Sequence, residues 1–168
     1  MVERRTSHQI ILGLGGNLGD RKANLRQAVQ ALAKWVTIQA ISPIYQTVPW
    51  GLADQPDFLN LCLAATTTLD PLPLLTQIKK IEAELGRQPG VRWGPRLIDI
   101  DILFYDDLIL NTESLTIPHP HLAERAFVLA PLADLVPDFR HPQSQRTVAH
   151  MLTTVDSTAV NRLAEPLF

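Results

Sequence analysis

The segment 97–104 constrains the fold more than any other part of this sequence, because its side chains alternate in character at a period of two. Such alternation predicts a β-strand whose two faces meet different surroundings. One face carries two neighbouring carboxylates, Asp99 and Asp101. The other face is apolar and predicts contact with a core through Ile98, Ile100, Ile102 and Phe104.

The two aspartates call for an explanation other than core burial. Ionised carboxylates at this spacing repel each other, and an unpaired buried charge is strongly unfavourable. The preceding turn contains Arg92 and Arg96, which lie too far back along the chain to cancel both acids. A hard divalent cation that holds a phosphate-bearing substrate would satisfy acids and arginines together. The alternative that the pattern leaves open is a pair of solvated surface acids.

The composition is that of one folded domain with a sizeable core. The chain has 168 residues, of which 46% are hydrophobic and 19% are charged. We expect a single domain over residues 1–168, with a core over residues 9–151 and a frayed tail over residues 152–168. The net charge of −2 offers no basic surface for nucleic acid. Any polyanionic ligand must therefore be met by local arginines and by metal.

Cysteine content and hydropathy bear on the cellular compartment. Cys62 is the single cysteine, which excludes an intramolecular disulfide and fits a reducing compartment. No apolar run is long enough to span a bilayer, and the polar start of the chain is unlike a secretory signal. We therefore expect a cytoplasmic protein without a membrane partner.

The order of the expected elements predicts a fold class. Two strand–helix–strand units follow each other, which favours an α+β fold, a ferredoxin-like βαββαβ antiparallel sandwich with both helices on one face. Pro43 places the second strand at a sheet edge, Asp20 caps the first helix, and Gly86 ends the second. The C-terminal extension, from residue 106 to about 151, is expected to add a short hairpin and helices. The four strands are expected at residues 9–14, 37–45, 58–66 and 97–104.

This arrangement brings unusual residues onto the sheet face that the two helices leave uncovered. Each of three strands has a uniformly apolar face for the helices, so the remaining side chains must point the other way. We expect a functional site on that face, formed by Gly13, Gly15, Phe58, Asn60, Asp99 and Asp101.

Other candidate motifs are weaker. The glycine-rich turn at residues 13–20 fails as a dinucleotide or P-loop motif, because Leu18 stands where glycine is needed and no Gly-Lys-Ser/Thr follows. It favours a tight turn that lets a substrate approach the backbone. His119 and His121 flank a proline without a third ligand, which is poor evidence for a metal site. The absence of a Ser/His/Asp or Cys/His grouping disfavours a protein nucleophile.

Several segments of the chain resemble those of a known family. Residues 92–103 resemble the signature segment of 6-hydroxymethyl-7,8-dihydropterin pyrophosphokinase, an enzyme of folate biosynthesis. Further segments resemble that family in the same order along the chain, over some three-quarters of its length. They are residues 15–20, 45–51, 54–60, 117–120 and 124–132.

The resemblance implies an activity and its co-substrates. The family transfers the β,γ-diphosphoryl group of ATP to the hydroxymethyl group of the pterin and releases AMP. It implies a Mg-dependent pyrophosphokinase with two Mg²⁺ ions, held by Asp99 and Asp101 as the metal ligands. We expect a monomer whose partners are ATP and the pterin.

The resemblance also implies roles for individual residues, each taken from the matching position. The catalytic set is Arg87, Arg92, Arg96, Asp99 and Asp101. The pterin-binding set is Thr47, Val48, Trp50, Phe58, Asn60 and Phe127. The ATP-binding set is Lys79, Glu82, Trp93, Arg96, Ile102, Thr116, His119 and Arg125. Which arginine between residues 87 and 92 reaches the phosphates stays open.

Departures from the family pattern affect single contacts. Gly16 stands where serine is frequent, and Ser114 and His121 stand where arginine occurs, while Pro120 replaces other residues after the histidine.

Two alternative functions remain open from the sequence. One is a ferredoxin-like module that binds pterin or nucleotide without turnover, and the other is a different Mg²⁺-dependent nucleotidyl or phosphoryl transferase. Formation of AMP rather than ADP from ATP would indicate pyrophosphoryl transfer and not this second alternative.

Overall fold

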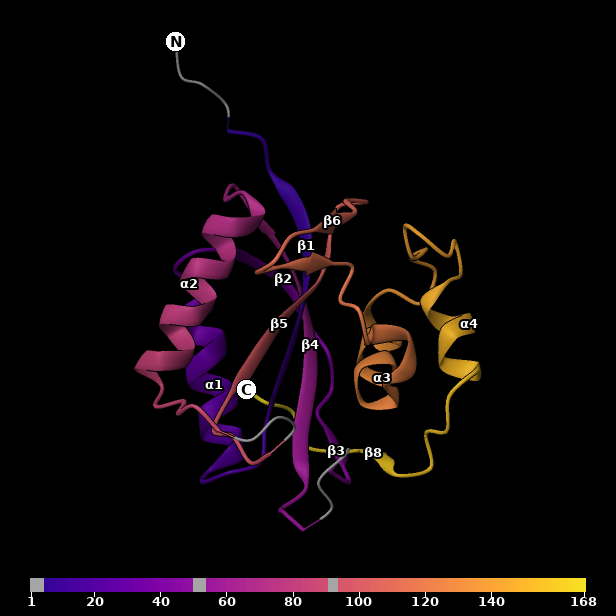
Figure 1. Cartoon of the computed structure of the whole chain (residues 1–168). Helices are drawn as coiled ribbons and strands as arrows, with labels where there is room; N and C mark the ends of the chain where they lie inside the picture. Colours follow the sequence, from indigo (N-terminus) through magenta and orange to yellow (C-terminus); the bar gives the residue numbers. More distant parts are fainter. Residues whose placement is uncertain (1–4, 50–53, 91–93) are drawn as a thin grey trace.

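The computed structural model describes residues 5–49, 54–90 and 94–168 (Figure 1). Strands and helices alternate in the first two-thirds of the chain, and shorter elements follow. The strands are β1 (His8–Gly16), β2 (Thr37–Ile41), β3 (Tyr45–Thr47), β4 (Phe58–Thr67), β5 (Asp99–Tyr105), β6 (Leu110–Asn111), β7 (Thr116–Ile117) and β8 (Val160–Arg162). The helices are α1 (Arg21–Leu32), α2 (Pro71–Glu84), the 3₁₀ turn Leu122–Glu124, α3 (Ala126–Leu135) and α4 (Val148–Thr153).

One antiparallel sheet organises the molecule, with the strand order β5-β1-β4-β3-β8 and with β2 also paired to β4. This confirms the predicted ferredoxin-like α+β sandwich. The single strand expected at residues 37–45 is instead two strands, β2 and β3, which pair with successive parts of β4. Pro43 lies in the break, where its missing N–H cannot contribute to a ladder. The edge prediction holds for β2, whereas β3 is covered by β8.

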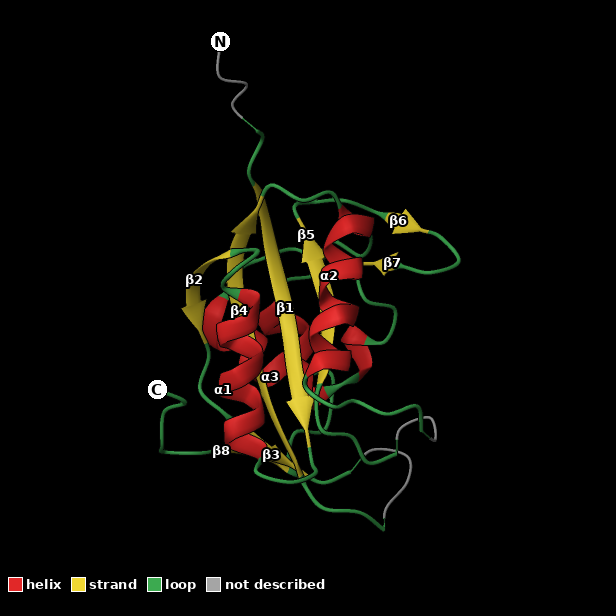
Figure 2. Ribbon diagram, turned by 90° about the vertical axis from the view of Figure 1, so that its left-hand side faces the viewer, coloured by secondary structure: helices red, strands yellow, loops and turns green. Residues whose placement is uncertain are grey.

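Helices α1 and α2 lie side by side on one face of the sheet, as the sequence predicted (Figure 2). The Asp20 side chain accepts a hydrogen bond from the Ala23 N–H and so caps α1. Gly86, with a φ of +91°, turns the chain after α2. No helix within the described ranges is long and apolar enough to cross a bilayer. The helices bury Leu25, Ala28, Val29, Leu32, Leu74, Ile78 and Ile81 against the sheet.

The expected apolar face of β5 holds only in part. Ile98, Ile100 and Ile102 lie in the core beneath α1 and α2. The pairing with β1 then shifts by one residue at Leu103, so that Phe104 joins the opposite core. Its ring lies 4.6 Å from the ring of Phe139. The prediction that Phe104 continues the same face was therefore wrong, because a bulge reverses the alternation.

The second face of the sheet is covered in part by α3 and α4, which lie opposite α1 and α2 (Figure 1). A second apolar core joins these helices to the sheet through Ile11, Cys62 and Leu103. The expected hairpin is formed by β6 and β7. Because α3 and α4 extend over only part of this face, the rest is free to form a cavity.

The C-terminal segment is ordered, contrary to the expected frayed tail. Strand β8 pairs with β3, and the Leu163 N–H donates to the carbonyl of Ile44 at 2.8 Å. Beyond the strand, Leu167 is buried and its carbonyl accepts from Nε of Arg26 at 2.7 Å. Backbone pairing and one buried side chain therefore hold this segment against β3 and α1.

Candidate active site

A cavity of about 400 Å³ opens on the second face of the sheet, beside α3. Gly13, Cys62 and Leu103 form part of its floor. It brings together residues on both sides of β1, which confirms the predicted convergence on this face. The β3–β4 side and α3 contribute Thr47, Val48, Phe58, Asn60 and Phe127, and the β5 side contributes Lys79, Arg87, Arg96, Asp99, Asp101, His119 and Arg125.

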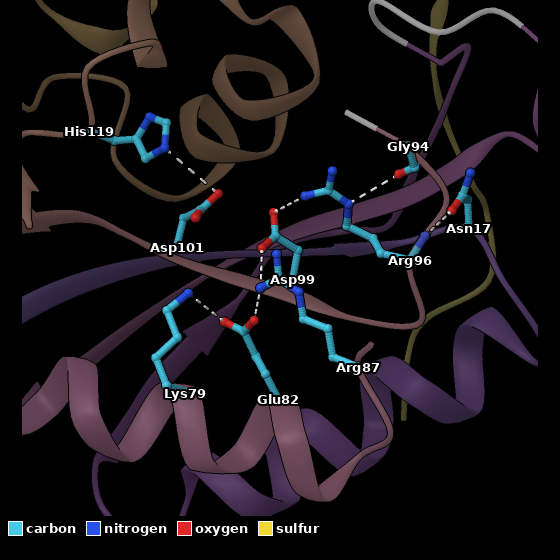
Figure 3. Close-up of polar contacts among 9 residues, drawn as sticks. All are labelled: Asn17, Lys79, Glu82, Arg87, Gly94, Arg96, Asp99, Asp101 and His119. Carbon is cyan, nitrogen blue, oxygen red and sulfur yellow. Dashed lines mark hydrogen bonds and ion pairs between the residues drawn. The ribbon is translucent and has the colours of Figure 1, made fainter. Parts of the chain in front are cut away.

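Asp99 is compensated by two arginines (Figure 3). Its two carboxylate oxygens lie 3.0 Å from Nη1 of Arg87 and 3.2 Å from Nη1 of Arg96. Arg87 also contacts Glu82, which is 2% exposed on α2, and Nζ of Lys79 lies 3.4 Å from the same glutamate. Acids and bases thus alternate from α2 to the loop before β5. The arginines are held by carboxylates and are close enough to turn toward an anion in the cavity.

Asp101 is not compensated in this way. Burial and, to a smaller extent, the charge of Asp99 together raise the pKa of Asp101 from 3.8 to about 7. The charge of Arg125 acts in the opposite direction. Nε2 of His119 lies 3.8 Å from the Asp101 carboxylate, which is too far for a hydrogen bond. Burial lowers the pKa of His119 to about 4, so the imidazole is neutral near pH 7. Asp101, unlike Asp99, therefore has no cationic side chain within hydrogen-bond distance among the described residues.

The tautomer of His119 follows from its backbone contact. The N–H of His121 donates to Nδ1 of His119 at 3.2 Å, so Nδ1 is the acceptor. In the neutral ring the proton then resides on Nε2, the nitrogen that points toward Asp101 (Figure 3). His119 can thus donate a hydrogen bond into the acidic part of the cavity without adding charge.

The other side of the cavity presents a buried polar edge and two aromatic side chains. Nδ2 of Asn60 donates to Oγ1 of Thr47 at 2.9 Å, and both residues are buried. A Cβ atom at Gly15 would lie 2.3 Å from Oδ1 of Asn60, so glycine is needed for this amide position. Phe58 and Phe127 also line the cavity. Such a site suits a flat heterocycle with hydrogen-bonding groups along one edge.

Several predicted residues lie elsewhere. Ile102 is in the core under α1 and α2, and its side chain does not line the cavity. Thr116 on β7 lies 3.5 Å from Asn111 and also does not line it. Trp50, Arg92 and Trp93 fall outside the described residues.

One residue that joins the site loops has no role in the sequence analysis. Asn17 is 2% exposed, and its amide donates to Oε1 of Gln55 and to the carbonyl of Pro56, each at 2.9 Å. Its Oδ1 accepts from the backbone N–H of Arg96 at 2.9 Å. Asn17 thus links the loop before β4 to the loop before β5. A polar residue between the glycines of the turn at residues 13–20 was the signal that could have found it.

Comparison with known proteins places this geometry in context. The model of the family described as 7,8-dihydro-6-hydroxymethylpterin-pyrophosphokinase (HPPK) matches residues 11–137. The 2-amino-4-hydroxy-6-hydroxymethyldihydropteridine pyrophosphokinase of Bacillus subtilis is 48% identical over 126 residues, or 74% of this chain and 75% of that protein. The protein of the same name from Aquifex aeolicus is 44% identical over 133 residues, or 79% of this chain and 83% of that protein.

Solved structures resemble the chain in fold. The wild-type HPPK-DHPS of Plasmodium falciparum, solved with pterin and p-hydroxybenzoate, superposes with a TM-score of 0.73 at 20% identity. The match covers 92% of this chain and 42% of that one, so the chain spans less than half of the larger protein.

Proposed function

Because the chain belongs to the 7,8-dihydro-6-hydroxymethylpterin-pyrophosphokinase family, we propose that its cavity carries out the family's reaction with Asp99 and Asp101 as magnesium ligands. The chain is a pyrophosphokinase of folate biosynthesis that uses ATP as co-substrate. It transfers the β,γ-diphosphoryl group of ATP to 6-hydroxymethyl-7,8-dihydropterin. The observation that carries the proposal is the under-compensated acid pair, which shares one cavity with a buried polar edge between phenylalanines.

The acid pair fits a divalent cation. Burial and the charge of Asp99 raise the pKa of Asp101, a change that a bound cation would oppose, and carboxylate oxygens are the ligands that Mg²⁺ prefers. No cluster of three or more His, Cys, Asp or Glu side chains is placed to hold a metal among the described residues, so phosphate oxygens and water must complete the shell. Two ions are proposed, and bound Mg²⁺ would supply neutralisation of the triphosphate charge.

The chain's own residues then position and neutralise the reacting group. We propose that Arg87 and Arg96 exchange their contacts with Asp99 for phosphate oxygens when ATP binds. Glu82 holds Arg87 until that exchange, and Lys79 and Arg125 add positive charge. His119 donates a hydrogen bond from Nε2 to a phosphate oxygen while its ring stays neutral. Arg92 and Trp93 belong to the same proposed ATP side, whereas Ile102 and Thr116 do not line the cavity and are given no part in it.

The pterin is proposed to lie on the β3–β4 side of the cavity. Asn60 and Thr47 hydrogen-bond its pyrimidine edge, and Phe58 and Phe127 enclose its ring. Val48 lines the same side, and Trp50 is expected to contribute from the adjoining loop. This placement puts the pterin across β1 from the acid pair, and transfer requires its hydroxymethyl group to approach the phosphates bound there.

A product assay tests the proposal. The assay mixes the full chain with ATP, Mg²⁺ and the hydroxymethylpterin. It should yield AMP and the pterin diphosphate in equal amounts, as measured by phosphorus NMR. ADP as the product would indicate a different phosphoryl transferase, and binding without turnover would indicate a binding module. Titration of Mg²⁺ in the same assay tests the metal requirement. A monomeric, cytoplasmic protein is part of the proposal, which light scattering and cell fractionation can check.

A further inference from the structure

Two pairs of residues, one on β3 and one on α3, lie at the side of the cavity proposed to bind the pterin. Tyr45 and Thr47 are two apart on β3 and point to the same face of the sheet. Phe127 and Asp134 are seven apart on α3 and therefore lie on the same face of the helix. Thr47 and Phe127 line the cavity, whereas Tyr45 and Asp134 do not. One member of each pair thus belongs to the site and the other lies outside it.

The outer members are joined by a strong directional contact. The hydroxyl of Tyr45 donates to Oδ2 of Asp134 at 2.5 Å, a hydrogen bond assisted by the carboxylate charge. Burial and Asp134 together raise the pKa of Tyr45 to about 12, so the phenol remains a donor throughout the neutral range. Tyr45 as a whole is 9% exposed, and its hydroxyl meets the Asp134 carboxylate at a position where the aspartate itself is exposed. Loss of the bond therefore leaves no buried charge behind.

Other contacts of β3 fix it within the sheet but not relative to α3. One edge of β3 pairs with β4 and the other with β8, where Arg162 stands opposite Tyr45. These ladders set the in-plane position of Thr47. Helix α3 packs on the sheet mainly through apolar side chains, whose contacts are not directional, and through a weak hydrogen bond from the Cys62 thiol on β4 to the carbonyl of Val128 at 3.7 Å. The bond between Tyr45 and Asp134 therefore adds a directional restraint on the separation between β3 and α3.

We propose that Asp134 is a positioning residue for the pterin, which acts through Tyr45 to set the spacing between Thr47 and Phe127. This inference rests on the pterin placement proposed above. Asp134 touches neither substrate, and its effect is on the width of the slot into which the heterocycle fits. A slot of fixed width reduces the ordering that pterin binding would otherwise require.

Steady-state kinetics of the full chain test the inference, with each substrate varied at saturation of the other. Tyr45→Phe and Asp134→Ala should each raise KM for the pterin about fivefold, because a slot that is no longer held at a fixed width must be ordered when the pterin binds. KM for ATP and kcat should stay within about twofold. The double variant should match the single ones, because both remove the same bond. Asp134→Asn keeps an acceptor oxygen and should recover most of the pterin affinity.

Control measurements separate positioning from stability. Asp138→Asn changes an exposed acid just beyond α3 and should behave like the unchanged protein. A lower Tm of Asp134→Ala with unchanged KM for the pterin would overturn the inference and leave a purely structural contact. An equal rise in both KM values, or additive effects in the double variant, would overturn it too. Failure of the unchanged protein to form AMP would instead refute the proposed function, and that measurement is made first.

Discussion

Replacing Asp101 with asparagine should make the free protein more stable while it abolishes turnover. Asp101 lies near Asp99 in a cavity where Arg87 and Arg96 are already engaged with that neighbour. Burial first, and the nearby charge of Asp99 second, disfavour the ionised Asp101 carboxylate in the folded state and raise its pKa. Asparagine has nearly the same shape and removes the charge. Catalysis should be lost because a ligand for the proposed cation is gone.

The magnitude follows from the pKa of this carboxyl. A rise from 3.8 to about 7 corresponds to an upper limit of about 4 kcal/mol when the group is ionised in both states. The side chain keeps 34% of its surface accessible, and solvent in the cavity screens the repulsion. We therefore expect a gain of about 1–2 kcal/mol, or roughly 3–6 °C in Tm for a domain of this size.

The sign of the pH dependence provides a sharper test. The folded-state pKa is raised, so folding takes up a proton between pH 3.8 and about 7, and wild-type stability falls as pH rises through that range. The advantage of asparagine should be largest near about pH 8, smaller near about pH 5 and absent below about pH 4. Differential scanning calorimetry of both proteins measures this directly.

Two outcomes would refute the reasoning about Asp101. One is a lower Tm of the variant near about pH 8, and the other is a gain that is independent of pH. MgATP provides an internal control, because it should raise the Tm of the unchanged protein more than that of Asp101→Asn. Asp138→Asn, at an exposed position, serves as the matched control for loss of one charge.

Three further substitutions probe the pterin side and the loops. Asn60→Ala should weaken pterin binding about 10–100-fold and leave ATP binding unchanged, by calorimetric titration of each ligand; equal losses would contradict the pterin placement. Gly15→Ala places a Cβ atom 2.3 Å from Oδ1 of Asn60, so it should displace that amide and raise KM for the pterin alone. An unchanged KM would show that the amide position is not required. Asn17→Ala removes the hydrogen bonds from a buried amide to the carbonyl of Pro56 and the N–H of Arg96, which should lower stability by about 1–3 kcal/mol in denaturant unfolding.

Local pattern predicted much of the fold because the determinants are local. Asp20 accepts from Ala23, three residues away, and Gly86 provides the positive φ after α2. The bulge at Leu103 is different in origin. It arises where β5 pairs with β1, between Ile11 and Leu12, and the isolated segment 97–104 alternates without interruption. Side-chain periodicity cannot report a register shift that a partner strand imposes.

The candidate site shows the same division between local and distant causes. Asp99 and Asp101 could be found because two charges on one strand face are anomalous within a few residues. Their different environments could not, since Asp99 pairs with Arg87 from the loop after α2 and Asp101 faces the neutral His119 beyond β7. The role of Asn17 likewise depends on two loops that approach each other only in the folded chain.

The order of the C-terminal segment follows from a break at Pro43, where the sequence predicts a sheet edge and not an interruption of the strand. Pro43 interrupts the strand expected at residues 37–45, so β3 forms separately along β4 with its other edge open. An open edge presents unpaired backbone groups, which β8 satisfies. A strand of three residues carries too little periodicity to be predicted by itself. Strand β8 forms because the open edge of β3 needs backbone hydrogen-bond partners, and not because of a pattern in residues 160–162.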